Sequence, residues 1–373
     1  MKKLICLLVV LCLLPLPARA AGEQISLSSP SAILIHPSGE ILYQKNPHEV
    51  RPIASVTKVM TLLLVFEAID SGTVTMADRV TGSAHAASMG GSQIWLEEGE
   101  SFTLEEMIKA VAICSANDCA VALAEHLAGS EEAFVARMND RAGELGMKHT
   151  TFKNACGLDE EGHASCAYDV ALMSAELIRH KKVKEYSSIR QSSLREGKMV
   201  LDNTNKMLGH YTGMTGLKTG YTSSAGYCLS ASAERDGTEL IAVVLGGETS
   251  QKRNADIAAL LNWGFANFVT VYPTADRPLM PIAVEMGKKG AVCIELAPAE
   301  GVAAKRGEKI TKTVTLPDSI KAPVQKGREL GMLTVEQQGR VLARIPIVAA
   351  EDVPRLSFGG ILSRLLSAAF MRS

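Results

Sequence analysis

The chain has 373 residues, of which 47% are hydrophobic and 21% are charged, and its formal net charge is -1. This length exceeds what one hydrophobic core usually supports, so a large domain followed by a smaller one is expected. The near-neutral charge provides no basic surface of the kind that binds nucleic acid, which excludes nucleic acid as the expected partner.

The N-terminal residues have the three parts of a secretory signal. Lys2 and Lys3 precede an apolar run from Leu4 to Leu14, and Ala18-Arg19-Ala20 ends the segment in a small-x-small pattern. The run is shorter than the ~20 apolar residues that cross a bilayer. We therefore interpret residues 1–20 as a signal peptide and expect an exported chain; an uncleaved anchor is the alternative, which the cleavage pattern disfavours.

Strand-like and helical segments then alternate between residues 25 and 271. The runs 32–35 and 40–43 flank a Pro/Gly turn and predict a β-hairpin. Residues 56–70 are apolar nearly all round, which predicts a buried helix. Residues 240–245 predict a buried strand, and residues 255–268 predict a helix packed near it. We assign residues 21–272 to the main domain.

The composition changes after Tyr272-Pro273. Short apolar runs at 291–296, 310–316 and 341–348 are separated by glycine and proline, which predicts a small all-β domain over residues 273–353. Gln338-Gly339 predicts a hairpin turn between two of its strands.

Residues 354–373 form the last segment, which has an apolar stripe at helical spacing. Arg364 and Arg372 lie off this stripe, so the segment predicts an amphipathic helix that lies in a membrane interface without crossing it. A helix docked on its own protein or on a dimer partner is the alternative. The apolar residues of the stripe are Phe358, Ile361, Leu362, Leu365, Leu366, Ala369 and Phe370.

The cysteines and histidines form no local metal-binding motif. No Cys-x-x-Cys, His-x-His or His-x-x-x-His pair occurs, so a zinc peptidase is not expected. An even number of cysteines outside the cytoplasm permits disulfides, but the spacing assigns no pairs. We interpret Cys114 and Cys119 as small buried apolar residues. The cysteines beyond the signal are Cys114, Cys119, Cys156, Cys166, Cys228 and Cys293.

Three short motifs occur in order along the main domain: Ser55-Val56-Thr57-Lys58, Ser115-Ala116-Asn117 and Lys218-Thr219-Gly220. Each motif alone is common, because a helix cap, a turn and a strand end would account for them separately. Together, in this order and in an exported chain, they indicate a serine-nucleophile active site.

The first motif has the geometry that a serine nucleophile needs. Three residues apart on a helix, Ser55 and Lys58 lie on the same face, so the amine can take the hydroxyl proton. Lys58 acts as a base only if its pKa falls, which burial and a second cation such as Lys218 promote. The backbone N–H of Ser55 at the helix start is a donor for an oxyanion.

These motifs and their surroundings resemble the low-molecular-mass penicillin-binding proteins, the serine D-alanyl-D-alanine carboxypeptidases. The resemblance covers nearly the whole chain. It is carried by residues 51–61, by 152–154 with Gly157-Leu158, His163 and Tyr168-Asp169, by 218–222 with 225–227, and by 246–253 with 261–265.

The resemblance implies an α+β fold of the transpeptidase-like type, with an antiparallel sheet flanked by helices and a helical subdomain, followed by a small all-β domain. It implies an enzyme that removes the terminal D-alanine from peptidoglycan stem pentapeptides through an acyl-enzyme on Ser55, with β-lactam antibiotics as inhibitors. Peptidoglycan synthesis, cell-wall biogenesis and cell shape would be its context, and the outer face of the cytoplasmic membrane its location. No cofactor or metal is implied.

The remaining site residues receive roles in this reaction. Ser115, expected in a loop, would relay a proton to the leaving D-alanine, and the Asn117 amide would hydrogen-bond the substrate backbone. Lys218 and Thr219 would hold the substrate carboxylate, and Gly220 would allow a close approach of the substrate strand. The resemblance adds the Tyr221 N–H as second oxyanion donor and Arg253 as a further carboxylate contact.

Two other functions compete with this interpretation. A serine β-lactamase uses the same three motifs, but Asp159, Glu160 and Glu161 do not form the Glu-x-x-Leu-Asn pattern that would aim a glutamate at the ester. Such an enzyme would not need residues 273–373. A catalytically silent wall-binding protein with the same fold is the second alternative. Endopeptidase action on cross-links involves the same chemistry and is not separated from it by sequence.

Overall fold

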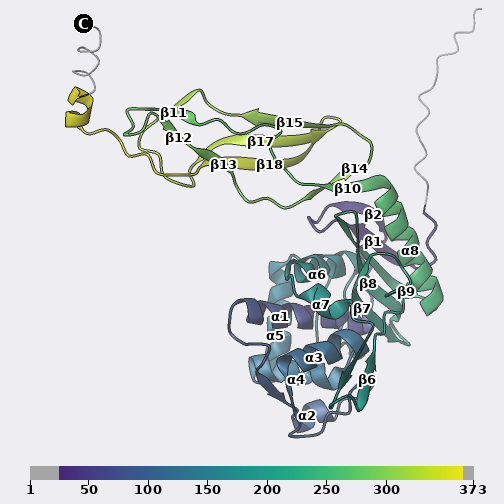
Figure 1. The fold of residues 1–373 in the computed structure, drawn as a ribbon. Helices are drawn as coiled ribbons and strands as arrows, with labels where there is room; N and C mark the ends of the chain where they lie inside the picture. The colour runs from purple at the N-terminus through teal and green to yellow at the C-terminus, as the bar shows by residue number, and fades with distance from the viewer. Residues whose placement is uncertain (1–24, 364–373) are drawn as a thin grey trace, which may run out of the picture.

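The structure, a computed structural model, describes residues 25–363 (Figure 1). The predicted signal peptide, residues 1–20, lies outside the described residues, as do residues 364–373 of the predicted tail helix. The main domain contains an antiparallel five-stranded sheet with helices on both faces, which confirms the predicted α+β fold.

The central sheet has the strand order β2-β1-β9-β8-β7, and each neighbouring pair is antiparallel. Two segments close together in sequence, β1 and β2, form its outer hairpin, as predicted. The strands are β1 (Ser31–Ile35), β2 (Ile41–Lys45), β7 (Met214–Thr222), β8 (Gly226–Arg235) and β9 (Thr238–Gly247). Two small hairpins, β3 (Arg79–Thr81) with β4 (Ser101–Thr103) and β5 (Gln191–Leu194) with β6 (Met199–Asp202), lie outside this sheet.

Helices cover both faces of the sheet and form the helical subdomain. Their bounds are η1 (Ala54–Thr57), α1 (Lys58–Asp70), α2 (Ala84–Ala87), α3 (Leu104–Lys109), η2 (Ala110–Cys114), α4 (Asn117–Ala128), α5 (Glu131–Glu144), α6 (Ala167–Arg179), α7 (Val183–Ser187) and α8 (Ser250–Asn267). Here η1 is a 3-10 turn and η2 is a π-helical turn.

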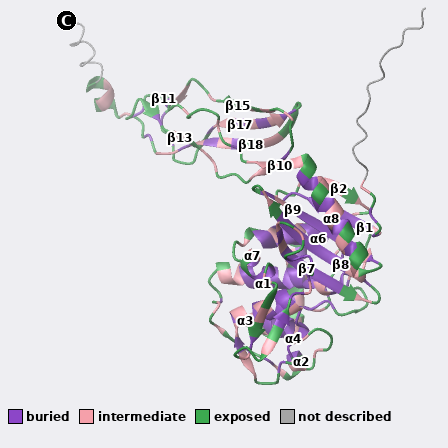
Figure 2. Cartoon of the chain, turned by 45° about the vertical axis from the view of Figure 1, so that its right-hand side comes forward, coloured by how far each residue is buried: buried purple, intermediate pink, exposed green. Residues whose placement is uncertain are grey.

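Alternating side chains of the central strands enter two separate cores. On β9, Ala242 and Val244 belong to the core covered by α8, whereas Val243 and Leu245 belong to the core that contains α1, α4 and α6. Figure 2 shows the buried residues gathered in this sheet and in the helices packed on it. A strand buried on both faces reads as a continuous apolar run, which is why residues 240–245 were predictable.

The buried helix expected at residues 56–70 is present, but its first turn is the tighter η1 and regular α-helix begins at Lys58. As predicted, α1 is buried nearly all round, with Met60 and Leu63 fully inaccessible. The helix expected from residue 255 begins earlier, at Ser250, because the Thr249 hydroxyl caps it by accepting a hydrogen bond from the Lys252 N–H.

The second domain is all-β, as expected. Gln338 and Gly339 both have positive φ, 49° and 78°, and form the predicted turn between β17 and β18. The apolar run at 291–296 is divided at Cys293 into β12 and β13, which belong to different sheets. The strands are β11 (Ile282–Glu285), β12 (Ala291–Val292), β13 (Ile294–Leu296), β14 (Val302–Lys305), β15 (Ile310–Thr315), β16 (Ser319–Lys321), β17 (Glu329–Gln337) and β18 (Arg340–Ala349).

The two domains are joined by backbone pairing and by ion pairs. Strand β10 (Phe268–Val271), which precedes the predicted boundary at residues 272 and 273, pairs with β14 of the second domain. Arg340 pairs with Glu40 at 3.0 Å, and Arg179 pairs with Glu300 at 2.8 Å. The second domain extends away from the main one and carries residues 358–363 at its far end (Figure 1).

The six cysteines between residues 25 and 363 are all free. Burial raises the pKa of the Cys114 thiol to about 11 and that of Cys119 well above its ordinary value, which keeps both thiols protonated and unreactive. The interpretation of these two residues as small apolar side chains fits this environment, although Cys114 is only partly buried.

Leu34 provides a test of the two-core arrangement. We expect Leu34→Ala to lower the free energy of unfolding by about 2–5 kcal/mol, because this fully buried side chain fills the space between β1 and α8. The matched control is Ile41→Ala on the neighbouring strand, whose side chain is 40% exposed and should lose far less. Urea unfolding of the full chain measures both changes, and equal losses would contradict the assignment of Leu34 to a closed core.

Candidate active site

The nucleophile candidate Ser55 lies in the η1 turn, directly before α1. The preceding residue, Ala54, has a φ of 47°, a conformation that side-chain-bearing residues rarely adopt. Gly157 packs against this turn so closely that an added Cβ would lie 2.0 Å from the Ala54 carbonyl oxygen. Close packing against Gly157 therefore helps to hold the strained turn in place. Backbone strain of this kind is concentrated at functional sites.

Lys58 meets Ser55 as the helical spacing predicts. Its Nζ lies 3.0 Å from Ser55 Oγ, 2.6 Å from Asn117 Oδ1 and 2.7 Å from the Cys156 carbonyl oxygen. Asn117 Oδ1 and the Cys156 carbonyl oxygen can only accept hydrogen bonds, so each binds one N–H group of the amine. The third position on nitrogen then faces Ser55, where a neutral amine presents its lone pair to the hydroxyl.

The charge state of Lys58 follows from its surroundings. The side chain is fully buried, and burial lowers its pKa to about 8 against the pull of nearby groups that favour the charged form. A second buried amine, Lys218, lies behind the same site on β7. Burial, together with the positive charge of Lys58, lowers the pKa of Lys218 well below its ordinary value.

The second motif joins η2 to α4. Ser115 ends the π-helical turn in the left-handed region, with a φ of 67°, and Asn117 begins α4. The Ser115 side chain is nearly buried, and within residues 25–363 its Oγ has no hydrogen-bond partner. A buried hydroxyl without a partner is costly in a folded protein, so this one is available to a bound group.

Asn117 has partners that differ from the substrate contact suggested by the sequence. Its Oδ1 accepts from Lys58, and its Nδ2 donates to the Gly90 carbonyl at 2.7 Å. Its backbone N–H donates to the Ser92 carbonyl at 2.7 Å. In this structure Asn117 therefore orients the amine and fixes the loop around residues 90–92.

Strand β7 forms one wall of the site and carries the third motif. An added Cβ on Gly220 would lie 2.7 Å from the Ile53 carbonyl oxygen and 3.1 Å from the Ser55 nitrogen. The close approach that requires glycine is thus to the backbone of the nucleophile turn. The following residue, Tyr221, lines the same cleft as Ser55.

The cleft in front of Ser55 has a volume of about 530 Å3 and contains six of the nine predicted site residues. Lys58, Asn117 and Lys218 lie behind it. The predicted residues that line the cleft are Ser55, Ser115, Thr219, Gly220, Tyr221 and Arg253. The sequence did not single out the others, which are Ser92, Thr204, Lys206, Tyr227, Ser250, Gln251 and Asn254.

The cleft is electropositive. No aspartate or glutamate lines it within residues 25–363, whereas Lys206 and Arg253 do. Arg253 is 4% exposed, donates to Asn254 Oδ1 at 2.9 Å and forms no ion pair with a carboxylate in this part of the chain. A buried guanidinium without a counter-ion favours an anionic ligand group beside it.

Residues 151–165 hold the base in place, a role that the sequence did not predict for them. Besides the Cys156 carbonyl, this segment provides the Ala155 carbonyl, which accepts from Thr61 Oγ1 at 2.6 Å. His163 Nδ1 accepts from the Lys153 N–H at 3.1 Å, so its Nε2–H donates to Thr57 Oγ1 at 2.7 Å. Burial lowers the pKa of His163 to about 4, which keeps this arrangement neutral.

Comparison with known proteins agrees with this geometry. Residues 18–249 match the family model described as D-alanyl-D-alanine carboxypeptidase, and residues 275–355 match the C-terminal domain of penicillin-binding protein 5. The D-alanyl-D-alanine carboxypeptidase DacF of Bacillus subtilis is 44% identical over 345 residues, which cover 90% of this chain and 88% of that protein.

Solved structures show the same likeness. Penicillin-binding protein 5 from Haemophilus influenzae has 30% identity and a TM-score of 0.77, covering 88% of this chain and 98% of its own. Penicillin-binding protein D2 from Listeria monocytogenes, in its ampicillin-bound form, has 35% identity and a TM-score of 0.59, covering 65% of this chain and 99% of its own.

The altered acidity of Lys58 can be measured directly. We expect its side chain to titrate near pH 8. Burial favours the neutral amine, and this effect outweighs the groups nearby that favour the charged form. NMR of protein carrying 13C-labelled lysine follows the titration, and Lys58→Met identifies the signal by removing it. A midpoint at the ordinary lysine value of 10.5 would exclude Lys58 as a base near neutral pH.

Proposed function

This chain belongs to the D-alanyl-D-alanine carboxypeptidase family, and on that basis we propose that it removes the terminal D-alanine from peptidoglycan stem pentapeptides through a Ser55 acyl-enzyme. The observation that carries this proposal is the 3.0 Å approach of Lys58 Nζ to Ser55 Oγ, with the other two amine donors held by Asn117 and Cys156.

Acylation begins when Lys58 takes the Ser55 proton and Ser55 Oγ attacks the carbonyl carbon of the penultimate D-alanine. The N–H groups of Ser55 and Tyr221 stabilise the oxyanion that forms. The peptide bond then breaks, and the proton passes from Lys58 through Ser115 to the departing amine. Lys58 is neutral again and activates the water that hydrolyses the ester.

The substrate carboxylate is held by the electropositive end of the cleft. Arg253 and Thr219 line this end, and Lys218 lies behind it. The Thr219 hydroxyl donates to Thr204 Oγ1 at 2.7 Å, so its oxygen is held at the cleft wall. Lys206 adds an exposed cation. Recognition of a free C-terminal carboxylate is what restricts a peptidase to the last residue of its substrate.

β-Lactams are proposed to acylate the same serine, as the ampicillin-bound relative suggests. Fast release of the penicilloyl group would need a base aimed at a water over the ester. The absence of a carboxylate among the cleft-lining residues of the described chain argues against a β-lactamase. The complete Ser55–Lys58 contact argues against a catalytically silent protein.

Ser55→Ala should abolish the reaction. We expect D-alanine release from a peptide ending in D-Ala-D-Ala to fall by at least ~10^3-fold, because no other side chain provides the nucleophile. Mass spectrometry of the wild type with penicillin should find a long-lived adduct on Ser55. Ser188→Ala, at an exposed serine outside the cleft, is the control and should keep full activity.

Two results would contradict the proposal. Unchanged D-alanine release by a folded Ser55→Ala protein would remove Ser55 from the mechanism. Rapid turnover of penicillin without accumulation of an adduct would favour the β-lactamase.

Export and membrane anchoring are proposed to place this enzyme at the outer face of the cytoplasmic membrane. None of the helices between residues 25 and 363 has the length and apolar character to cross a bilayer. The proposal therefore concerns an interfacial helix in residues 354–373. Its described part carries two apolar residues one turn apart, Phe358 at 83% and Leu362 at 49% exposure.

Vesicle binding tests the anchor. We expect the full chain to float with phosphatidylglycerol-containing vesicles, and the double variant Phe358→Ser with Leu362→Ser to lose most of this binding, because apolar area drives interfacial insertion. Met280→Ser, at a 74% exposed apolar residue elsewhere in the second domain, is the matched control. Equal flotation of both variants would contradict an anchor at this stripe.

A further inference from the structure

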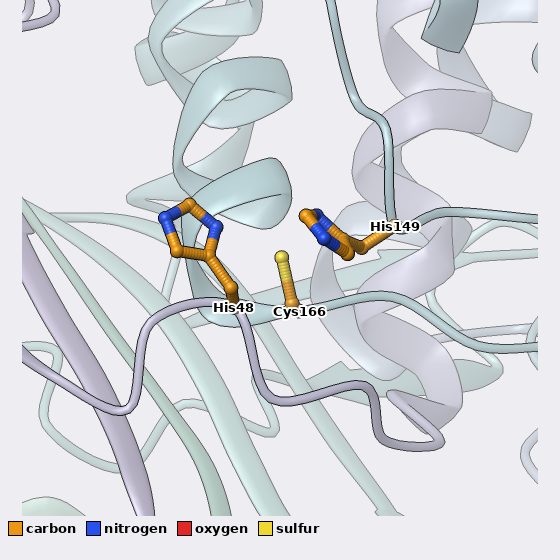
Figure 3. A group of neighbouring side chains, drawn as sticks. All are labelled: His48, His149 and Cys166. Carbon is orange, nitrogen blue, oxygen red and sulfur yellow. The ribbon is translucent and has the colours of Figure 1, made fainter.

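Three metal-ligating side chains that are far apart in sequence meet on the main domain, away from the catalytic cleft. The ligand atoms of His48, His149 and Cys166 all lie within 4.8 Å of one another. Figure 3 shows the Cys166 sulfur between the two imidazole rings. We propose that these three residues form a Zn2+-binding site.

The donor set suits zinc. Two imidazoles and one thiolate are borderline and soft ligands, and three protein ligands with one solvent position form a known tetrahedral zinc arrangement. Zinc binds nitrogen at about 2.0–2.1 Å and sulfur at about 2.3 Å, so donors around one ion lie roughly 3.3–3.8 Å apart. The donors here need to approach one another by about 1 Å.

The two histidines are free to make this movement. Both are exposed, and no ring nitrogen of either forms a hydrogen bond or ion pair with any residue between 25 and 363. The rings already contact each other, with centroids 5.3 Å apart, and the His48 ring also contacts Tyr168 at 5.0 Å. Solvent access to both rings provides the entry path and the fourth ligand, a water.

The backbone positions of the ligands are fixed by the first turn of α6. The carbonyl of Pro47, beside His48, accepts from the Tyr168 N–H at 2.9 Å. The backbone N–H of His149 donates to Asp169 Oδ2 at 2.7 Å. Cys166 is the N-cap residue of this helix, and its Sγ accepts from the Asp169 N–H at 3.5 Å. The site is therefore preorganised, which reduces the entropy lost on binding.

Metal binding requires the deprotonated form of Cys166, although burial raises the pKa of the free thiol to about 12. Cys166 coordinates as a thiolate, so binding releases its proton to solvent and places a negative charge at the positive end of α6. Zn2+ then neutralises this buried sulfur.

Cobalt spectroscopy with matched variants tests the site. Full-length protein stripped with a chelator should bind one equivalent of Zn2+, and Co2+ in its place should give a sulfur-to-cobalt charge-transfer band that only a Co–S bond produces. His48→Ala and His149→Ala should each weaken Zn2+ binding by at least about tenfold. Cys166→Ser, which keeps a helix-capping oxygen, should abolish the band.

The controls replace the same residue types elsewhere. His126→Ala removes an exposed histidine on α4, and Cys293→Ser removes the exposed cysteine of the second domain; both should bind metal like the wild type. Zinc binding without the charge-transfer band, or binding that the His48 and His149 variants do not weaken, would overturn the proposal. Because His48 is exposed, its variant remains informative even if Cys166→Ser fails to fold.

Discussion

An amine in the protein interior, Lys58, is the group on which the site depends. A neutral lysine near neutral pH requires removal from water, and the apolar core around α1 provides this environment. The same burial demands partners for the amine hydrogens, which Asn117 and Cys156 supply from two other parts of the chain. The fold therefore has two effects on Lys58. It lowers the pKa of the amine, and it directs the lone pair of the neutral amine at Ser55.

A second consequence of this burial is an unbalanced positive potential. Lys218 and Arg253 are also buried, and in the described chain neither forms an ion pair with a carboxylate. The buried guanidinium of Arg253 destabilises the folded protein unless a ligand compensates its charge, and burial lowers the pKa of Lys218 well below its ordinary value. A substrate that ends in a carboxylate supplies this compensation, so binding and lysine deprotonation are coupled: each cation that the carboxylate neutralises changes the field at Lys58.

Features that depend on residues close together in sequence could be predicted, whereas contacts between distant segments could not. Ser55 and Lys58 meet because helical geometry brings residues three apart together, and β9 was recognisable from its continuous apolar run. Cys156 supplies a backbone carbonyl from 98 residues away, and any residue type offers that atom, so no pattern could identify it. The contacts of Asn117 with Lys58 and of Gly220 with the backbone of Ser55 also join residues far apart in sequence, so the substrate roles predicted for these two residues gave no indication of them.

Residues 151–165 connect the catalytic base to the proposed metal site. The middle of this segment supplies the carbonyl that holds Lys58, and its ends are fixed by short antiparallel bridges, Thr151 with Ala164 and Arg51 with Ser165. Cys166 directly follows this segment in sequence, and His149 lies two residues before it. An ion that joins these two residues to His48 would close the segment at its base, so the position of the Cys156 carbonyl would depend on a clamp far from the cleft. Because the hydrogen bond from Lys58 tolerates little displacement, such an ion would help to hold the Cys156 carbonyl in its catalytic position.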